Sequence, residues 1–385
     1  MFAKIGEAIR LNRRAFVVND CLIDNNVMAV KAFDAVSDRY LYRFIQLQDF
    51  STLARSTTVP SLRKGDIEGI HFPLAPTNEQ TRIADKLDAV LARVDACRDR
   101  LDRIPAILKR LRQSVLSTAT SGKLLEAWKS KSGARSSWSV GKLSDLLIGK
   151  PRNGYSPRAV EKVTSVKSLS LSATTSGVFR PEYFKYIDEV ISPDSHLWLE
   201  PGDILIQRAN TLEYVGTSAM YQGPASTFIY PDLMMKARAN GATLPRFLLL
   251  ILKSDRVREH FRSNATGTAR NMPKINQQTV LSAPACWPSL TEQAEIVRRV
   301  ESLFALADRV EARYAATRAQ LEKLTPATLA KAFRGELVPQ DPNDEPAEVL
   351  LKRIRAKRGG SGADNSKRAR NRKSPQASAQ EEIPC

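Results

Sequence analysis

The sequence predicts an α+β protein in which strand-rich domains are separated by a pair of long antiparallel coiled-coil helices. Three observations support this. A stretch of more than sixty residues occurs twice without a gap, at 60–124 and at 273–337. Each copy places apolar residues at alternating steps of four and three, which is the spacing of a coiled-coil seam. Between the copies, short apolar runs are bounded by Gly, Pro, Asn and Ser, as in a domain rich in strands.

The two copies are offset by 213 residues. A different segment precedes each copy. The duplication therefore implies a pseudo-symmetric molecule in which two similar helical segments carry two different surfaces. The offset relates these identical pairs: Pro60/Pro273, Glu79/Glu292, Gln80/Gln293, Ile83/Ile296, Asp95/Asp308, Leu108/Leu321, Leu111/Leu324, Leu116/Leu329, Ala119/Ala332, Gly122/Gly335 and Leu124/Leu337.

Each copy predicts one long helix that ends near its glycine, Gly122 or Gly335. A helix with apolar residues on one side is not stable alone, so the simplest fold pairs the two copies. We expect Pro105 to kink the first helix without ending it, and Thr325-Pro326 to break the second. The seam is predicted to bring one group of leucines, Leu101, Leu108 and Leu111, against another, Leu321 and Leu324.

The segments before and between the helices resemble each other. The run RYLYRFIQLQDF has the character of PRFLLLILKSDRVREHF, where we expect one helix over 244–261, and LIDNNVMAVKA resembles FIYPDLMMKARA. The front of the chain therefore matches only the second half of such a domain, and we expect Val27, Val30, Leu41, Phe44 and Ile45 to lack cover. The expected divisions are a partial domain (1–75), a long helix (76–124), a linker (125–137), a complete domain (138–288), a second long helix (289–337) and a basic, disordered tail (338–385).

The charge balance points to a polyanionic partner. The formal net charge is +18 and the pI is about 9.9, which favours nucleic acid or an anionic surface. No apolar run is long enough to span a membrane, and the first residues carry no secretion signal. The scattered cysteines fit a reduced cytoplasm and argue against a structural zinc site.

Motifs of catalysis are missing from the sequence. It has no phosphate-binding loop, no nucleophile elbow, no amino-methyltransferase motif and no nuclease-type acidic pair followed by Lys. Its three histidines have no partners at useful spacing. These absences disfavour an enzyme with fused methylase or nuclease chemistry, and they favour a binding protein.

Three polar clusters are candidates for contact with nucleic acid. Each combines Arg or Lys with Asn, Thr or Tyr in a loop bounded by glycine, and these side chains read base edges and phosphates. The alternative is that these loops are polar only because solvent surrounds them. The candidates are Lys150, Arg152, Asn153, Tyr155 and Arg158 in the first cluster, Arg208, Asn210 and Thr211 in the second, and Arg270, Asn271 and Lys274 in the third.

At these residues the chain resembles the DNA-specificity subunits of type I restriction–modification systems. The resemblance is carried by the Pro, Glu-Gln and Ile that start each long helix (Pro76–Ile83, and Pro288–Ile296 with one extra residue), by the Gly-x-Leu ends at 122–124 and 335–337, and by GDILIQRANTLEYVG. It implies two target-recognition domains, each reading half of a split site in double-stranded DNA.

The resemblance also implies partners. The paired helices would dock the modification (methylase) subunits, and a restriction (translocase–nuclease) subunit would join them. S-adenosylmethionine, ATP and magnesium would bind those partners, and this chain would carry no cofactor or metal. The shortened front domain leaves one alternative open, a coiled-coil interaction scaffold from a truncated specificity gene, without specific DNA binding.

Overall fold

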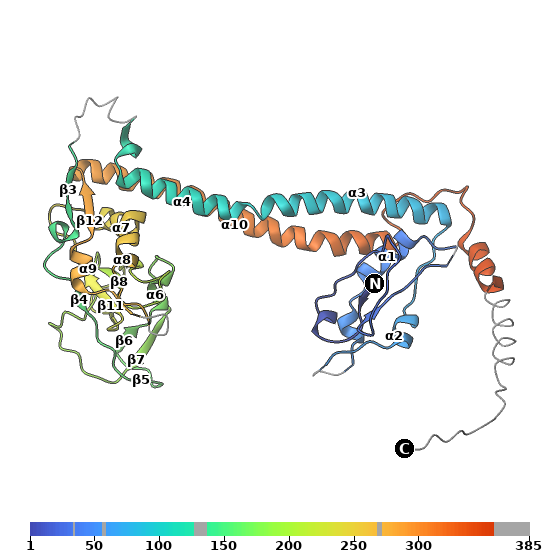
Figure 1. The fold of residues 1–385 in the computed structure, drawn as a ribbon, viewed down its shortest axis with the longest axis horizontal. Helices are drawn as coiled ribbons and strands as arrows, with labels where there is room; N and C mark the ends of the chain where they lie inside the picture. The colour runs from blue at the N-terminus through green and yellow to red at the C-terminus, as the bar shows by residue number, and fades with distance from the viewer. Residues whose placement is uncertain (34, 56–58, 127–136, 268–271, 358–385) are drawn as a thin grey trace, which may run out of the picture. The chain divides into compact units, whose positions relative to one another are not determined.

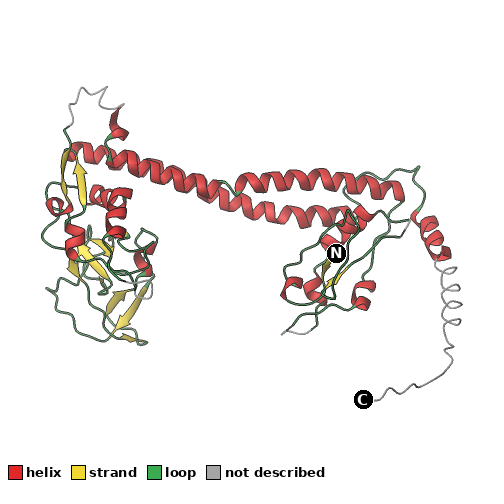
Figure 2. Cartoon of the chain, in the orientation of Figure 1, coloured by secondary structure: helices red, strands yellow, loops and turns green. Residues whose placement is uncertain are grey.

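The chain forms two compact units in a computed structural model that describes residues 1–33, 35–55, 59–126, 137–267 and 272–357 (Figure 1). The first unit comprises Met1–Asp102 and Tyr314–Cys385, and the second comprises Arg103–Arg313. Helix α10 (Leu290–Phe333) contributes its first part to the second unit and its last part to the first. Each unit combines helices with short strands (Figure 2), which confirms the predicted α+β class.

The second unit contains two four-stranded sheets and a separate strand pair. One sheet has the order β4-β11-β8-β9 and is antiparallel throughout. The other has the order β10-β6-β7-β5, with β10 parallel to β6. The strands are β3 (Ser139–Lys142), β4 (Arg152–Asn153), β5 (Ala159–Val160), β6 (Val166–Leu169), β7 (Phe184–Ile187), β8 (Ile204–Gln207), β9 (Ser218–Met220), β10 (Phe228–Ile229), β11 (Met234–Ala237) and β12 (Pro284–Trp287), which pairs with β3.

Strand β8 lies between two hydrophobic cores. Successive side chains of a strand point to opposite faces of its sheet. Ile204 and Ile206 therefore join the core beneath the helices, whereas Leu205 joins a second core with Tyr221 and Tyr230. This double burial fixes the register of the strand, because a slip by one residue would exchange the two faces.

The helix expected over 244–261 is two helices, which corrects the prediction. Helix α7 (Pro245–Lys253) ends at Ser254, whose extended backbone also starts α8 (Asp255–Ser263). The Ser254 hydroxyl donates to the Ile251 carbonyl at 2.7 Å and so satisfies an acceptor at the end of α7. The short helices of this unit also include η3 (Lys123–Leu125), η4 (Leu143–Leu146), α6 (Ser172–Thr175) and α9 (Gln277–Leu281).

The first long helix is interrupted, contrary to the prediction of a kink alone. Helix α3 (Thr77–Leu101) ends before Asp102, and α4 (Ile104–Thr120) begins with Pro105 in its first turn. A proline ring collides with the carbonyl four residues earlier and lacks a donor, so it costs least near the start of a helix. Gly122 and Gly335 have φ of 83° and 77° and follow the ends of α4 and α10, as predicted.

The second long helix continues through its proline, so the predicted break at Thr325-Pro326 is wrong. Pro326 lies inside α10, which runs on to Phe333. The residues after it are held by packing: Leu329 and Ala332 are buried with Ile83 and Leu87 of α3. Their burial offsets the backbone hydrogen bond that the proline removes.

The two copies pair antiparallel within each unit. In the second unit, Arg112 of α4 pairs with Asp308 and Glu311 at 2.6 and 2.8 Å, and Arg299 donates to the Leu124 carbonyl at 3.1 Å. Residue numbers thus rise along one helix as they fall along the other.

The leucine seam is only partly buried. Leu108 is buried, Leu101 and Leu321 are half-buried, and Leu111 and Leu324 are 38% and 40% exposed. The buried seam of the first unit instead uses Ile83, Leu87 and Leu91 against Leu329 and Ala332. The leucines of the predicted set, apart from Leu108, are therefore not the fully buried residues of the paired helices, because a heptad pattern does not specify how deeply each turn is buried.

The first unit has a core of its own. The strands β1 (Phe2–Ala3) and β2 (Val27–Met28) pair antiparallel beside α1 (Asp38–Leu47). Phe44 and Ile45 are buried here with Phe2 and Phe50, so the expectation that both lack cover is wrong, whereas Val30 is 40% exposed. The short helices of this unit before α3 are η1 (Glu7–Ile9), η2 (Phe50–Leu53) and α2 (Lys64–Glu68).

The tail is ordered in its first part, which corrects the expected disorder of 338–357. Residues 347–357 are helical and Leu350 is buried. Asp344 pairs with Arg82 of α3 through both carboxylate oxygens, at 3.3 and 2.5 Å. Residues 358–385 lie outside the described part. Within that part, none of the helices combines the length and apolar content needed to cross a bilayer.

The repeated Glu-Gln pair attaches each long helix to its domain. Gln80 is buried, and its amide donates to the carbonyls of Ala75 and Ala35 at 2.8 and 3.3 Å. Its Oε1 accepts from the backbone N–H of Ser37, the residue that starts α1. A single buried amide thereby joins the start of α3 to the start of α1.

Candidate nucleic-acid interface

The first polar cluster surrounds the edge strand β4. Gly154 donates to the Met234 carbonyl at 3.1 Å, and Tyr155 donates to the Tyr230 carbonyl at 2.9 Å. A Cβ on Gly154 would lie 2.2 Å from the carbonyl oxygens of Tyr230 and Pro231, so only glycine fits. The loop is therefore held against the sheet by its backbone, while the side chains of the five predicted residues point to solvent: Lys150, Arg152, Asn153, Tyr155 and Arg158 are all exposed.

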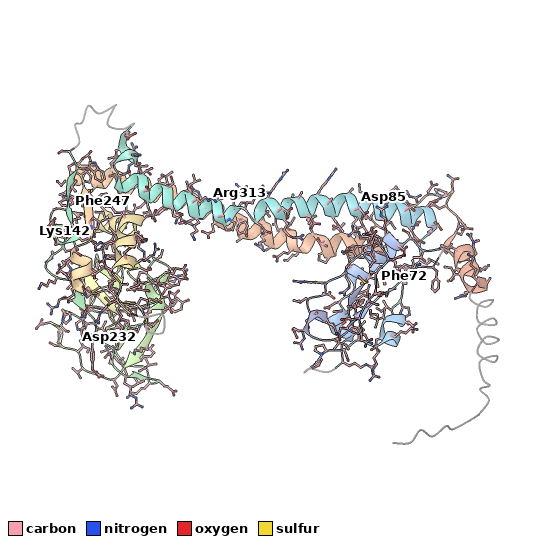
Figure 3. All side chains as sticks on the ribbon, in the orientation of Figure 1. Phe72, Asp85, Lys142, Asp232, Phe247 and Arg313 are labelled. Atoms are coloured by element: carbon pink, nitrogen blue, oxygen red, sulfur yellow. The ribbon has the colours of Figure 1, made fainter. Side chains whose placement is uncertain are left out.

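The second cluster follows strand β8, and Arg208 is fixed at its centre. Its N–H donates to the Leu233 carbonyl at 2.8 Å, and its own carbonyl accepts from Ile275 at 2.9 Å. The guanidinium donates weakly to the Asp232 carbonyl at 3.4 Å and keeps most of its donors for other partners. Asp232 lies at the opposite end of the domain from Phe247, a residue of the helix-side core (Figure 3). The Arg208 loop thus lies on the side of the domain away from α7.

Asn210 and Thr211 shape the turn after Arg208. The Asn210 amide donates to Gln207 Oε1 at 2.7 Å, and its oxygen accepts from the Thr211 N–H at 2.7 Å. Gln207 is buried and donates to the Leu171 carbonyl and two threonine hydroxyls. These contacts account for Asn210 as a turn-forming residue. A base contact by its remaining donor stays a prediction.

The third cluster lies beside the second. Lys274 forms a bridge with Thr266 through two backbone hydrogen bonds, of 2.9 and 2.8 Å, and a second bridge with Ala209. The Asn210 N–H donates to the Pro273 carbonyl at 3.2 Å. Lys274 is exposed. Arg270 and Asn271, which we also predicted, lie outside the described residues.

One polar pocket joins the clusters and contains residues that the sequence analysis missed. It has a volume of about 340 Å³ and is lined by Asn153, Arg208, Asn276, Gln277 and Gln278. Asn276 starts α9, and its side chain accepts from the Thr279 N–H at 2.8 Å. In the sequence these residues are marked by three consecutive amide side chains that begin two residues after Lys274, the last residue of the third predicted cluster.

A second pocket, of about 400 Å³, lies on the other side of β4 and contains four basic residues. Two of them are neutralised: Arg238 pairs with Asp203 and Glu200, both at 2.8 Å, and Lys236 pairs with the buried Asp203 at 3.4 Å. Burial lowers the pKa of Lys236. The lining also includes Asp194, so with Lys150 and Arg152 the pocket has four cations against three carboxylates and a small net positive charge.

Two ionisable side chains at this surface are held by hydrogen bonds. A hydrogen bond to the Glu189 carboxylate at 3.0 Å raises the pKa of Tyr155, so the phenol remains protonated and oriented. Burial lowers the pKa of Arg258 to about 10. Arg258 remains charged at neutral pH and donates to the carbonyls of Val215 and Glu213, at 2.5 and 2.7 Å, which holds the end of the Arg208 loop.

The structure thus brings together Asn153, Arg208 and Lys274 from clusters that lie far apart in sequence. Lys150 and Arg152 line the neighbouring basic pocket, and Tyr155, Arg158 and Thr211 are exposed on the flanking loops. His196 and His260 contact backbone carbonyls, of Asn153 and Thr279. In the described part of the chain, no three His, Cys, Asp or Glu side chains are grouped as metal ligands would be.

Comparison with known proteins matches residues 4–106 to the type I restriction modification DNA specificity domain. The chain is similar to the EcoKI specificity subunit of Escherichia coli K12, with 33% identity over 331 residues, covering 83% of this chain and 71% of that protein. It is also similar to the EcoDI specificity subunit of Escherichia coli, with 31% identity over 370 residues and coverage of 87% and 80%.

Two solved structures share the fold. A chain from a study of complex assembly and conformational transition of the type I R-M system matches with a TM-score of 0.58 and 19% identity, over 78% of this chain and 72% of that one. The HsdS subunit from Thermoanaerobacter tengcongensis matches with a TM-score of 0.50 and 19% identity, over 78% and 71%.

Proposed function

This chain belongs to the type I restriction–modification specificity subunits, and on that premise we propose that the face around Arg208 is its surface for contacting DNA bases. The role of the chain is to recognise DNA sequence for a type I restriction–modification complex, and it is a specificity subunit rather than a catalytic one. The scaffold alternative, without specific DNA binding, is not favoured.

The observation that carries the proposal is the composition of the pocket around Arg208. Its five lining side chains are one guanidinium and four carboxamides, and none is a carboxylate. Arg pairs in bidentate fashion with guanine, and Asn and Gln pair with adenine, each good pair discriminating by about 1–3 kcal/mol. The basic pocket beside β4 provides phosphate contacts, which position a protein on the duplex without reading sequence.

The wider assembly follows from the family. We propose that the chain joins methylase subunits and a restriction subunit on double-stranded DNA in the cytoplasm, and that its two units read the two halves of a split site. S-adenosylmethionine, ATP and magnesium are then bound by those partners. Binding of duplex DNA by this chain alone is expected to be weak, and to weaken steeply as salt increases, because phosphate contacts release counterions.

Arg208→Ala tests the proposal, with Arg246→Ala as its matched control. Arg246 is an exposed arginine on α7, next to Phe247 at the other end of the domain, and it pairs with Glu301. In complexes assembled with the methylase subunits, Arg208→Ala should weaken specific DNA binding by about 5- to 150-fold, from the loss of about 1–3 kcal/mol. Arg246→Ala should bind as the parent does. An Arg208→Ala complex with undiminished affinity and sequence preference would contradict the proposed surface.

A further inference from the structure

The first unit repeats the backbone frame that holds Arg208, and Lys4 occupies the position of Arg208 in it. Strand β1 pairs with β2 as β8 pairs with β11, with Phe2 opposite Met28 and Ile206 opposite Met235. Lys4 is the second residue after Phe2, as Arg208 is after Ile206. The backbone hydrogen bonds of the two residues also match. The Lys4 N–H donates to the Asn26 carbonyl at 2.7 Å, as the Arg208 N–H donates to the Leu233 carbonyl at 2.8 Å. The Lys4 carbonyl accepts from the Leu62 N–H at 2.9 Å, as the Arg208 carbonyl accepts from the Ile275 N–H at 2.9 Å.

The loop after this position also matches. Gly6 donates to the Pro60 carbonyl at 2.8 Å, and Asn210 donates to the Pro273 carbonyl at 3.2 Å. Pro60 and Pro273 are the first identical pair of the duplicated segment. The residue after each proline forms two backbone hydrogen bonds with a partner strand segment, Ser61 with Arg55 and Lys274 with Thr266.

The short helix that completes the pocket in the second unit is present in the first unit as well. Helix α9 is preceded by Asn276, and α2, also of five residues, is preceded by Arg63. Position by position, Arg63 replaces Asn276, Lys64 replaces Gln277 and Gly65 replaces Gln278. The frame is therefore the same, but amide side chains have been exchanged for two cations and a glycine.

We propose that Lys4, Arg63 and Lys64 form a second DNA-contacting surface, on the first unit, that binds mainly phosphates. This rests on the proposed role of the Arg208 face. Arg63 and Lys64 are exposed and Lys4 is half-buried. Within the described residues, neither Lys4 nor Arg63 has a carboxylate within 4 Å, and Lys64 has only the exposed Glu68 at 3.5 Å. Cations and a glycine in place of the three amides of the second unit favour the duplex backbone over adenine edges.

The test compares two triple variants in the complex assembled with methylase subunits. One removes the proposed surface (Lys4→Ala, Arg63→Ala, Lys64→Ala), and the other removes three exposed cations of α7 and α8 (Arg246→Ala, Arg256→Ala, Arg262→Ala). The dissociation constant for duplex DNA is measured from 50 to 200 mM salt. Each phosphate contact contributes about 0.9 to the slope of log affinity against log salt. The first variant should lower that slope by about 2–3, and the second should leave it nearly unchanged.

Lysine acetylation of the parent complex gives an independent readout that requires no variant to fold. DNA should protect Lys4 and Lys64 from the reagent and leave the exposed Lys142, which lies toward the Phe247 end of the other domain, reactive. An unchanged salt slope together with unprotected Lys4 and Lys64 overturns the inference. If Arg208→Ala still weakens binding under those conditions, only the second surface fails. If Arg208→Ala is silent as well, the proposed function of the first surface fails with it.

Discussion

Gln293 accepts a hydrogen bond from the backbone N–H of Leu244 at 2.8 Å, just as Gln80 accepts one from Ser37 in the other copy of the repeat. The Gln293 amide also donates to the carbonyls of Pro288 and Ala242, both at 3.0 Å. In each copy, the Gln of the Glu-Gln pair thus attaches the start of the long helix to the adjoining domain through hydrogen bonds of its side-chain amide.

We predict that Gln293→Ala destabilises the second unit. The change leaves the Leu244 donor and two carbonyls unsatisfied in a buried position, and each such group costs about 1–3 kcal/mol. Chemical denaturation should show a loss in the free energy of unfolding of at least about 2 kcal/mol. The exposed Gln113→Ala on α4 is the control and should change it by less than about 0.5 kcal/mol. Equal losses in the two variants would show that Gln293 is not an attachment point.

Gly154→Ala should damage both stability and DNA binding. Its new Cβ would meet the backbone oxygens of Tyr230 and Pro231 at 2.2 Å, which forces the residues after β4 away from the segment before β11. Overpacking of this kind costs about 1–3 kcal/mol. It would also displace Asn153 and Tyr155. Thermal unfolding and a DNA-binding titration measure the two effects.

The control for that variant is Gly149→Ala. Gly149 has φ of 65° but open space around it, so alanine there carries backbone strain of about 1–2 kcal/mol and no collision. Its DNA affinity should stay close to that of the parent. If Gly149→Ala impairs DNA binding as strongly as Gly154→Ala does, the close approach of Gly154 is not what positions the loop.

Two leucines three residues apart on α4 should respond differently to truncation. Leu108 is 5% exposed and Leu111 is 38% exposed. Leu108→Ala should cost about 2–5 kcal/mol in the free energy of unfolding, as is usual for a buried leucine. Leu111→Ala should cost clearly less, because solvent already reaches its side chain. Denaturant midpoints measured for both variants decide the matter, and similar losses would contradict the pairing described for α4 and α10.

The Glu295 carboxylate should contribute stability that depends on pH. Hydrogen bonds from Arg298 and Arg299 lower the pKa of Glu295 to about 2. A carboxyl group whose pKa is lower in the folded state than its unfolded value of about 4.3 stabilises the fold above that value. This contribution disappears as the pH falls through about 2.

The measurement compares the parent with Glu295→Gln by thermal unfolding across this range. The parent should be the more stable above about pH 5, and the difference should vanish by about pH 2. The effect should be modest, because partly exposed ion pairs are screened by solvent. A difference that is constant from pH 7 to pH 2 would show that the charge of Glu295 is irrelevant.

The sequence predicts those features that depend on local pattern. The four-three spacing identifies both long helices, and the resemblance of RYLYRFIQLQDF to PRFLLLILKSDRVREHF is confirmed, because α1 and α7 are held by Gln80 and Gln293 in the same way. The first two polar clusters, and Lys274 of the third, lie on one domain as expected. These signals are local, since each arises from periodicity or from a short run of residues.

Features that depend on distant partners could not be predicted. Pro105 and Pro326 are both prolines in a heptad pattern, yet the first separates two helices and the second lies within one. Buried residues follow both prolines, Leu108 after the first and Leu329 after the second, so neither the heptad pattern nor this burial distinguishes the two sites. The role of Asn276 also depends on a distant partner, because only the fold brings it beside Arg208.

The frame around Lys4 and Arg208 has an evolutionary consequence. It is built almost entirely from backbone N–H and C=O groups, which every residue except proline provides in full. Side chains at its positions can therefore be exchanged without loss of the support beneath them. After duplication of such a frame, point substitutions can change what each copy recognises. Arg63 in one copy and Asn276 at the equivalent position of the other are one such difference within a single chain.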